Sequence, residues 1–195
     1  MLSLWLSMLA FILVGSIAPG PVCVVTVSSA ARVGLPGAMP YVVGASLGYA
    51  LMVLLLGLGL LGSLAQNPQV LQGLAWVGAA YMLYLAWRLA RAKPGLPRAD
   101  NARVPGFWAG ALAQWLNPKA WLYSLSGLGL FVSNQAQSLA VFCMVSLLVC
   151  LFGVGCWAVL GHLLGGRLPS VRAMRVFNLL MALLLVLSVM LILWR

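Results

Sequence analysis

The sequence has 195 residues, of which 64% are hydrophobic and only 6% are charged, and its mean hydropathy is +1.10. A soluble domain carries about a quarter charged residues, so this composition excludes a water-soluble fold and indicates that the chain lies in lipid. The net charge of +10 would favour a nucleic-acid partner in a soluble protein. Here the basic residues stand between apolar segments, so we expect membrane lipid and no nucleic acid as a partner.

Apolar segments follow one another along the chain. Each is continuous over about 20 residues or more, which predicts helices rather than the alternating strands of a membrane barrel. We therefore predict an all-α integral membrane protein with about six transmembrane helices, over residues 3–30, 38–62, 69–92, 105–132, 138–165 and 174–194. No basic residue precedes the first segment, so we interpret it as a retained span and not as a cleaved signal peptide.

Pro, Gly and polar residues mark the connections between these segments, as expected for turns. The predicted breaks lie at 32–37, 66–68, 133–135 and 167–175, and the one long polar loop covers 93–104. We interpret residues 1–195 as a single transmembrane transporter domain, with halves of about 1–92 and 105–195 joined by this loop. Three spans in each half would invert one half relative to the other, as in many transporters.

Lys and Arg residues are distributed unevenly among the connections. Nine of them lie in the first, third and fifth connections or at the adjoining span ends, and the second and fourth have none. Basic connections face the cytoplasm, so loop 93–104 is predicted to be cytoplasmic and both termini periplasmic. The predicted location is the bacterial inner (plasma) membrane, with several spans.

Two apolar segments contain proline breaks. The first segment is interrupted at Pro19-Gly20-Pro21 and the fourth at Asn117-Pro118-Lys119. A proline inside a helix removes a backbone donor and clashes with the preceding turn. In a membrane such a break persists only where protein or a water-filled cavity covers the freed backbone groups. The first span of each half is therefore predicted to be broken.

Lys119 is costly inside a membrane, at about 2.5–3.5 kcal/mol for a central lysine. It either extends to a membrane surface or lines the solute path, where it would meet a carboxylate. Broken helices also offer N-termini for a carboxylate and free carbonyls for an ammonium group, which suits an amino acid without selecting one. The predicted substrate-binding residues are Pro19, Gly20, Pro21, Asn117, Pro118 and Lys119.

Other polar and sulfur-containing residues give weaker signals. His162, the single histidine, is either a structural residue or a proton-coupling residue, because histidine titrates near neutral pH. The four cysteines form no C-x-x-C pattern and are interpreted as small buried hydrophobes. Asp100 is the single acidic residue and lies in the polar loop, so no carboxylate cluster would bind a divalent cation. We predict no catalytic residues, no metal site and no cofactor.

Several local patterns, taken in order, resemble those of a known family. They are Pro19-Gly20-Pro21 followed by Arg32, Gly34, Gly44 and Gly48; residues 78–88 (GAAYMLYLAWR); Phe107, Gly110 and residues 116–120 (LNPKA); and Arg175 with Asn178. On these patterns the chain is identified as a member of the lysine-exporter (LysE/RhtB) family of amino acid efflux permeases, over essentially its whole length. One departure is Val22, where the family often has Asp or Asn.

The resemblance implies efflux of amino acids or their derivatives, driven by the proton gradient as an antiport. Residues 156–162 (CWAVLGH) and 182–186 (ALLLV) are similar to the members that export cysteine and O-acetylserine, which would give His162 more weight. Homoserine, threonine or leucine are the alternative solutes, because apolar pockets separate close analogues by only about 1–3 kcal/mol. A homodimer is left open.

Functions of other classes are alternatives to export. A membrane-embedded thiol redox enzyme would use the cysteines, but neither a C-x-x-C nor a serine–histidine–acid set is present. The absence of membrane carboxylates disfavours a metal exporter. The cost of retaining Lys119 disfavours a subunit that does not transport. Pairs of glycines four residues apart, such as Gly161 with Gly165, predict close helix packing.

Overall fold

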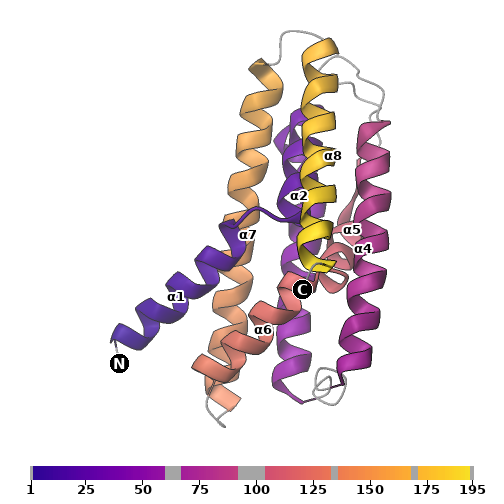
Figure 1. The fold of residues 1–195 in the computed structure, drawn as a ribbon. Helices are drawn as coiled ribbons and strands as arrows, with labels where there is room; N and C mark the ends of the chain where they lie inside the picture. Colours follow the sequence, from indigo (N-terminus) through magenta and orange to yellow (C-terminus); the bar gives the residue numbers. More distant parts are fainter. Residues whose placement is uncertain (1, 60–66, 92–103, 133–135, 168–170, 194–195) are drawn as a thin grey trace.

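The described part of the chain consists of helices. The computed structural model describes residues 2–59, 67–91, 104–132, 136–167 and 171–193, and these contain no strand. The helices are α1 (Leu2–Ile17), α2 (Pro21–Gly57), α4 (Pro68–Ala90), α5 (Phe107–Trp115), α6 (Pro118–Phe131), α7 (Ala136–Arg167) and α8 (Val171–Leu193) (Figure 1). The prediction of an all-α chain is confirmed for these residues.

By length and hydropathy alone, two helical stretches in the described residues are long and apolar enough to cross a membrane, Pro21–Gly57 and Ser138–Gly165. Four predicted connections lie wholly or partly outside the described residues. The residues outside are 66 of the turn at 66–68, 93–103 of the loop 93–104, all of the turn at 133–135, and 168–170 of the break at 167–175. Helix α8 begins at Val171, a few residues before the predicted start at 174.

The predicted break at 32–37 is confined to one residue. Helical structure continues from Pro21 to Gly57, and Gly34 alone leaves it, with φ of 77° and ψ of 177°. A side chain is strained at positive φ, so glycine suits this position. Pro36 and Pro40 follow inside the helix, where each removes a backbone donor.

The chain reverses its direction at Gly34. Before it, Val27 and Ala31 lie against Gly161 and Gly165, so this part of α2 runs parallel to α7. After it, Gly57 lies against Leu139, near the start of α7, so the second part runs antiparallel. Gly34 itself packs beside His162. Helix α2 therefore consists of two arms, 21–33 and 35–57, that lie along the same neighbour.

Both proline breaks are present where the sequence predicts them. Helix α1 ends at Ile17 and α2 begins at Pro21, with extended backbone at Gly20. Helix α5 ends at Trp115 and α6 begins at Pro118. The arm that follows the first break is covered by protein, since every residue from Pro21 to Ala31 is buried. This burial encloses the α2 side of the break, whereas Ile17 and Pro19 on its other side are exposed.

Glycines allow the helices around these breaks to approach closely. A Cβ atom on Gly161 would overlap the backbone of Val27, and one on Gly165 would overlap that of Ala31. Likewise, a Cβ atom on Gly44 would overlap the backbone of Phe107 in α5. The predicted role of the glycine pairs in packing is confirmed for these three positions, because backbone contact of this kind excludes any larger residue.

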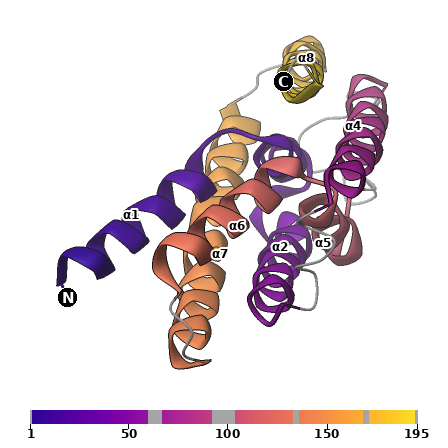
Figure 2. The ribbon, with the colours of Figure 1, turned by 60° about the horizontal axis from the view of Figure 1, so that its bottom comes forward.

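The long helices stand side by side and the shorter ones cross them. In Figure 1 the helices α2, α4, α7 and α8 run roughly along one direction, whereas α1 and α6 lie obliquely and the first residues of α1 project away from the bundle. Helix α2 packs mainly on α7 and α5, and α4 packs mainly on α8. Figure 2 shows the α4–α8 pair at one side of the bundle and α1 at the other. The proline breaks lie between them.

Candidate functional site

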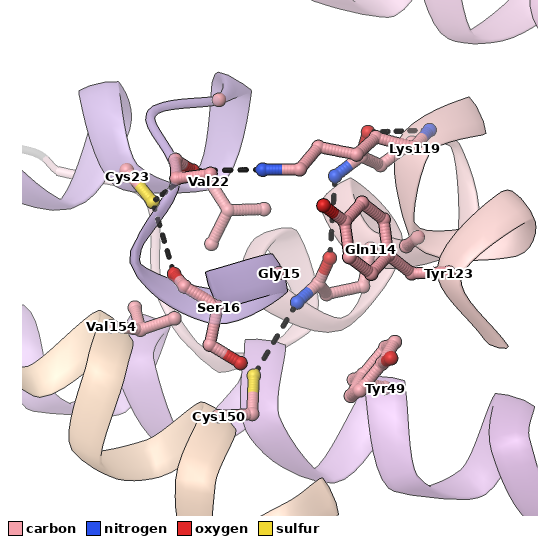
Figure 3. Close-up of a pocket in the computed structure, with 14 residues that line it drawn as sticks. Gly15, Ser16, Val22, Cys23, Tyr49, Gln114, Lys119, Tyr123, Cys150 and Val154 are labelled. Atoms are coloured by element: carbon pink, nitrogen blue, oxygen red, sulfur yellow. Dashed lines mark hydrogen bonds between the residues drawn. The ribbon is translucent and has the colours of Figure 1, made fainter. Parts of the chain in front are cut away.

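A pocket lies where the two broken helices meet. Its lining comes from both breaks and from the faces of α2, α6 and α7 that turn toward them (Figure 3). The lining residues are Gly15, Ser16, Ala18, Gly20, Val22, Cys23, Tyr49, Gln114, Asn117, Lys119, Ala120, Tyr123, Cys150 and Val154. Residues from the beginning, middle and end of the sequence therefore share one small cavity inside the helix bundle.

The end of α1 presents backbone carbonyls at this place. The last carbonyls of any helix have no intrahelical partner, and here side chains from elsewhere bind them. Lys119 Nζ donates to the Ala18 carbonyl at 2.8 Å, and Trp157 Nε1 donates to that of Ile17 at 3.1 Å. The Cys23 thiol is 3.8 Å from the carbonyl oxygens of both Ser16 and Ala18. This end of α1 therefore binds donors, including a cation.

Lys119 reaches the first break from the second. Its side chain is half-buried, extends from the first turn of α6 toward the end of α1, and lies with Nζ 5.7 Å from the centre of the Tyr123 ring (Figure 3). The only acidic residue of the sequence is Asp100, so no carboxylate of the described residues can pair with this ammonium group. Its partners are a carbonyl and an aromatic face, which stabilise a cation without neutralising it.

Two helices begin at the pocket and direct their positive ends toward it. Gly20 precedes α2 without a side-chain cap, and Pro21 has no N–H, so the backbone donors at this end come from Gly20, Val22 and Cys23. At the start of α6, the Asn117 side-chain oxygen accepts from the Lys119 backbone N–H at 3.2 Å. Helix N-termini attract anions, so this part of the pocket favours a carboxylate.

The opposite part of the pocket is built from Gln114, Cys150 and Tyr49. All three are buried, and Gln114 lies between Lys119 and Cys150 in Figure 3. Gln114 Nε2 donates to Cys150 Sγ at 3.6 Å, and Asn117 Nδ2 donates to Gln114 Oε1 at 3.5 Å. The sequence prediction missed these residues. Gln114 alone gave a usable signal, as a polar amide in an apolar run one turn before Asn117.

The structure brings together part of the predicted set. Gly20, Asn117 and Lys119 line the pocket. Pro19, Pro21 and Pro118 form the two breaks and are not among the residues that line the pocket, so their part in substrate binding stays a prediction. His162 lies elsewhere, half-buried on α7, where a Cβ atom on Gly34 would be 3.6 Å from its Nδ1 atom. The part of His162 in proton coupling stays a prediction.

The cysteines differ in their surroundings. All four are free thiols; Cys23 and Cys150 are buried and line the pocket, whereas Cys143 is half-buried and Cys156 is exposed. The interpretation of all four as buried hydrophobes is thus wrong for Cys156, because its position on α7 turns it away from the bundle. Among the residues that the structure describes, no group of three or more His, Cys, Asp or Glu side chains is placed to bind a metal ion.

The polar groups of the pocket match a zwitterion. An ammonium group and helix N-termini are present for an anion, and the carbonyls of α1 are present for a cation. The described lining holds no carboxylate or histidine that would act as a general base for a nucleophile. The arrangement is therefore suited to binding a small molecule that carries both charges.

Comparison with known proteins identifies the family of the chain. Residues 13–193 match the profile of the family described as LysE type translocator. The cysteine/O-acetylserine efflux proteins of Salmonella choleraesuis and Salmonella typhimurium are each 39% identical to this chain over 183 residues, covering 90% of both sequences. The Escherichia coli K12 protein of that name is 37% identical over 157 residues, covering 78% of this chain and 80% of its own length. No solved structure matches the chain.

Proposed function

Since the chain belongs to the LysE type translocator family, we propose that the amino acids it exports are cysteine and O-acetylserine. Amino acid export itself follows from the family and from relatives that cover most of the chain. Members of this family are membrane transporters and not enzymes, which removes the thiol redox enzyme from consideration. The narrower substrate is taken from the function named for the relatives.

One contact supports the assignment of the binding site above all others. Lys119 Nζ donates to the carbonyl of Ala18 at 2.8 Å, across 101 residues of sequence, and so joins the two breaks. This bond leaves the ammonium charge without an anionic partner in the pocket. A solute carboxylate would provide that partner, because opposite charges attract more strongly in a partly buried site than in water.

The same exchange would free a place for the solute ammonium group. When Lys119 turns to the carboxylate, the half-buried Ala18 carbonyl keeps only the Cys23 thiol, a weak donor 3.8 Å away. The α-ammonium group of the solute carries three N–H donors and would replace Lys119 there. We therefore assign the carboxylate to Lys119 and the start of α2, and the ammonium group to the end of α1. Gly20, Asn117 and the three prolines hold this geometry.

Pairing between helices supports two inverted halves, 1–92 and 105–195. Each half begins with a broken helix, α1 with the first arm of α2 or α5 with α6. The second span of the first half, the second arm of α2, packs on the second span of the other half, α7. The third spans of the two halves, α4 and α8, also pack on each other. Six spans result, counting each broken helix once.

We further propose that the chain lies in the bacterial inner membrane with both termini periplasmic. The relatives with cysteine/O-acetylserine efflux names come from bacteria. The basic residues lie in alternate connections, which places loop 93–104 in the cytoplasm. Export from that side requires the pocket to open alternately to the two surfaces, a motion that the broken helices would accommodate.

The test compares export by variants of Lys119. Cells loaded with labelled cysteine, O-acetylserine, homoserine, threonine, leucine or lysine are followed for loss of label with and without the overproduced protein. Wild type should speed the loss of cysteine and O-acetylserine. Lys119→Met should lower this export at least tenfold, because it leaves a solute carboxylate unpaired inside the membrane. Lys119→Arg should keep part of it, since the charge remains.

Lys93→Met is the matched control, because it removes the other lysine of the sequence, which lies in the predicted cytoplasmic loop. Its export should equal that of wild type once the amounts of protein in the membrane are matched. Full export by Lys119→Met would refute the assignment of the binding site. Export of leucine or threonine but not of cysteine and O-acetylserine would refute the narrower substrate and leave the exporter class in place.

A further inference from the structure

Gln114 occupies the part of the pocket that the charges of an amino acid would leave free. We propose that its side-chain amide recognises the side chain of the transported amino acid, by donating an N–H to a thiol sulfur or an ester oxygen. This inference rests on the proposed function, since it assigns the remaining part of the same pocket. The residue that would set the preference for polar side chains is thus Gln114.

The first observation is that this buried amide has weak partners. Gln114 is 6% exposed, so its polar atoms have lost most of their contact with solvent. A primary amide offers two N–H donors and an oxygen with two lone pairs. The two contacts found in the described part of the chain are long, 3.6 Å to Cys150 Sγ and 3.5 Å from Asn117 Nδ2. Since sulfur is a weak acceptor, the amide would gain from a better partner.

The second observation is where this amide stands. Lys119 and Cys23 lie at one end of the pocket and Cys150 and Tyr49 at the other, with Gln114 between them (Figure 3). A solute whose carboxylate meets Lys119 and whose ammonium group meets Ala18 would extend its side chain toward Gln114. Asn117 connects the two regions, because it caps α6 with its oxygen and contacts Gln114 with its nitrogen.

The third observation is the acceptor that the amide already has. Gln114 donates to a protein thiol, so an acceptor of the same type as the thiol of cysteine is already bound there. The thiol of a cysteine solute would take the place of Cys150 as acceptor. The ester oxygens of O-acetylserine are stronger acceptors, and the polar ester would reach the same amide. An apolar side chain of equal shape would offer no acceptor, so the amide would keep only its weak contact with Cys150, and polar sites reject such analogues.

The experiment measures transport ratios in proteoliposomes of the purified full-length chain. The transport rate of labelled cysteine is divided by that of its apolar isostere α-aminobutyrate. The rate of labelled O-acetylserine is divided in the same way by that of its apolar isostere homoleucine. Wild type should prefer the polar member of each pair. Gln114→Met keeps the length of the side chain and removes the amide. It should lower the preference about tenfold for the ester pair and about threefold for the weaker thiol pair, as expected for one hydrogen bond.

Two further variants sharpen the result. Gln114→Asn keeps an amide and should retain part of the preference for the polar solutes. Gln72→Met makes the same chemical change at an exposed position of α4, away from the pocket, and should leave both ratios as in wild type. Because each ratio is taken within one preparation, a lower yield of folded protein does not alter it.

Several outcomes would overturn the inference. Wild-type ratios in Gln114→Met would do so while leaving the proposed function intact. Equal transport of the polar and apolar members by wild type would also overturn the inference. This outcome needs no variant, so the test holds even if Gln114→Met fails to fold. Transport of no amino acid by wild type would instead refute the proposed function, and the inference with it.

Discussion

Lys119 keeps its place in lipid through backbone groups and an aromatic ring. Its ammonium group binds the carbonyl at the end of α1 and faces Tyr123. Val22 is apolar and lines the same pocket. A carboxylate at that position would compete with a solute for the cation. The apolar residue leaves the charge of Lys119 available, which fits a carrier whose solute brings its own anion.

Asn117 offers a test of the second break at the level of one side chain. Its oxygen caps α6, and loss of such a cap costs about 1 kcal/mol. Asn117→Ala should therefore lower the thermal midpoint of the detergent-solubilised protein by a few degrees. Asn117→Ser, which also caps a helix, should restore most of the loss. The midpoint is read from the temperature at which soluble, monodisperse protein disappears; equal midpoints for Ala and wild type would contradict the capping role.

The residues of the pocket were only partly predictable. Proline, glycine and a buried lysine stand out in an apolar sequence, so Gly20, Asn117 and Lys119 could be identified from residue type alone. Tyr49 and Cys150 could not, because each lies within a long helix, and its neighbours depend on how α2 and α7 cross. Gln114 was visible as a polar residue in an apolar run. Its connection to Cys150 depended on how α5 and α7 both pack on α2.

Glycines set the distance between the helices that carry the pocket. Gly161 lies against the backbone of Val27, so a methyl group there would force α7 away from the first arm of α2. Gly161→Ala should therefore destabilise the protein by about 1–3 kcal/mol, as overpacking does, and reduce export. The measurements are the thermal midpoint in detergent and the export of labelled O-acetylserine.

Gly155 on the same helix provides the control. Nothing lies within 4 Å of the place where its Cβ atom would be. Gly155→Ala should leave export unchanged and stabilise α7 by about 0.5–1 kcal/mol, because alanine favours a helix over glycine. Similar losses of stability in both variants would show that helix propensity, and not contact with Val27, governs Gly161.

The helices themselves were predictable to different degrees. Proline placed both breaks correctly, because its missing donor and its ring act locally. The turn predicted at 32–37 is a single residue, Gly34, since helical geometry returns at once on either side. The sequence contains Pro36 and Gly37 there, which suggested a longer break. Pro36 is tolerated because it lies in the first turn of the helical arm that begins after Gly34. The sequence alone did not show that the chain reverses at Gly34.

The two ends of the molecule are defined by charge. Seen as a whole, α2 with α7 and α4 with α8 form the pairs that would relate one half to the other. In the proposed orientation, the connections with basic residues would lie on one side of the membrane and those without on the other. Orientation depends on this distribution and not on the packing of any one helix.

Orientation can be tested with fusions to alkaline phosphatase, which is active only in the periplasm. A fusion after residue 98, in the predicted cytoplasmic loop, should be inactive, and one after residue 134 should be active. Fusions to green fluorescent protein at the same positions should give the opposite result, since that protein fluoresces after folding in the cytoplasm. The reverse pattern in both sets would show that the termini face the cytoplasm.

The bond from Lys119 to Ala18 also has a consequence for biogenesis. A ribosome adds about 5–20 residues per second, so the 101 positions between the two residues take roughly 5–20 seconds to synthesise. The first broken helix leaves the ribosome within that interval, before the lysine that will bind its last carbonyl has been synthesised. The nascent segment must therefore find temporary donors in interfacial water or in the insertion machinery, and the pocket is completed only after the second half has entered the bilayer.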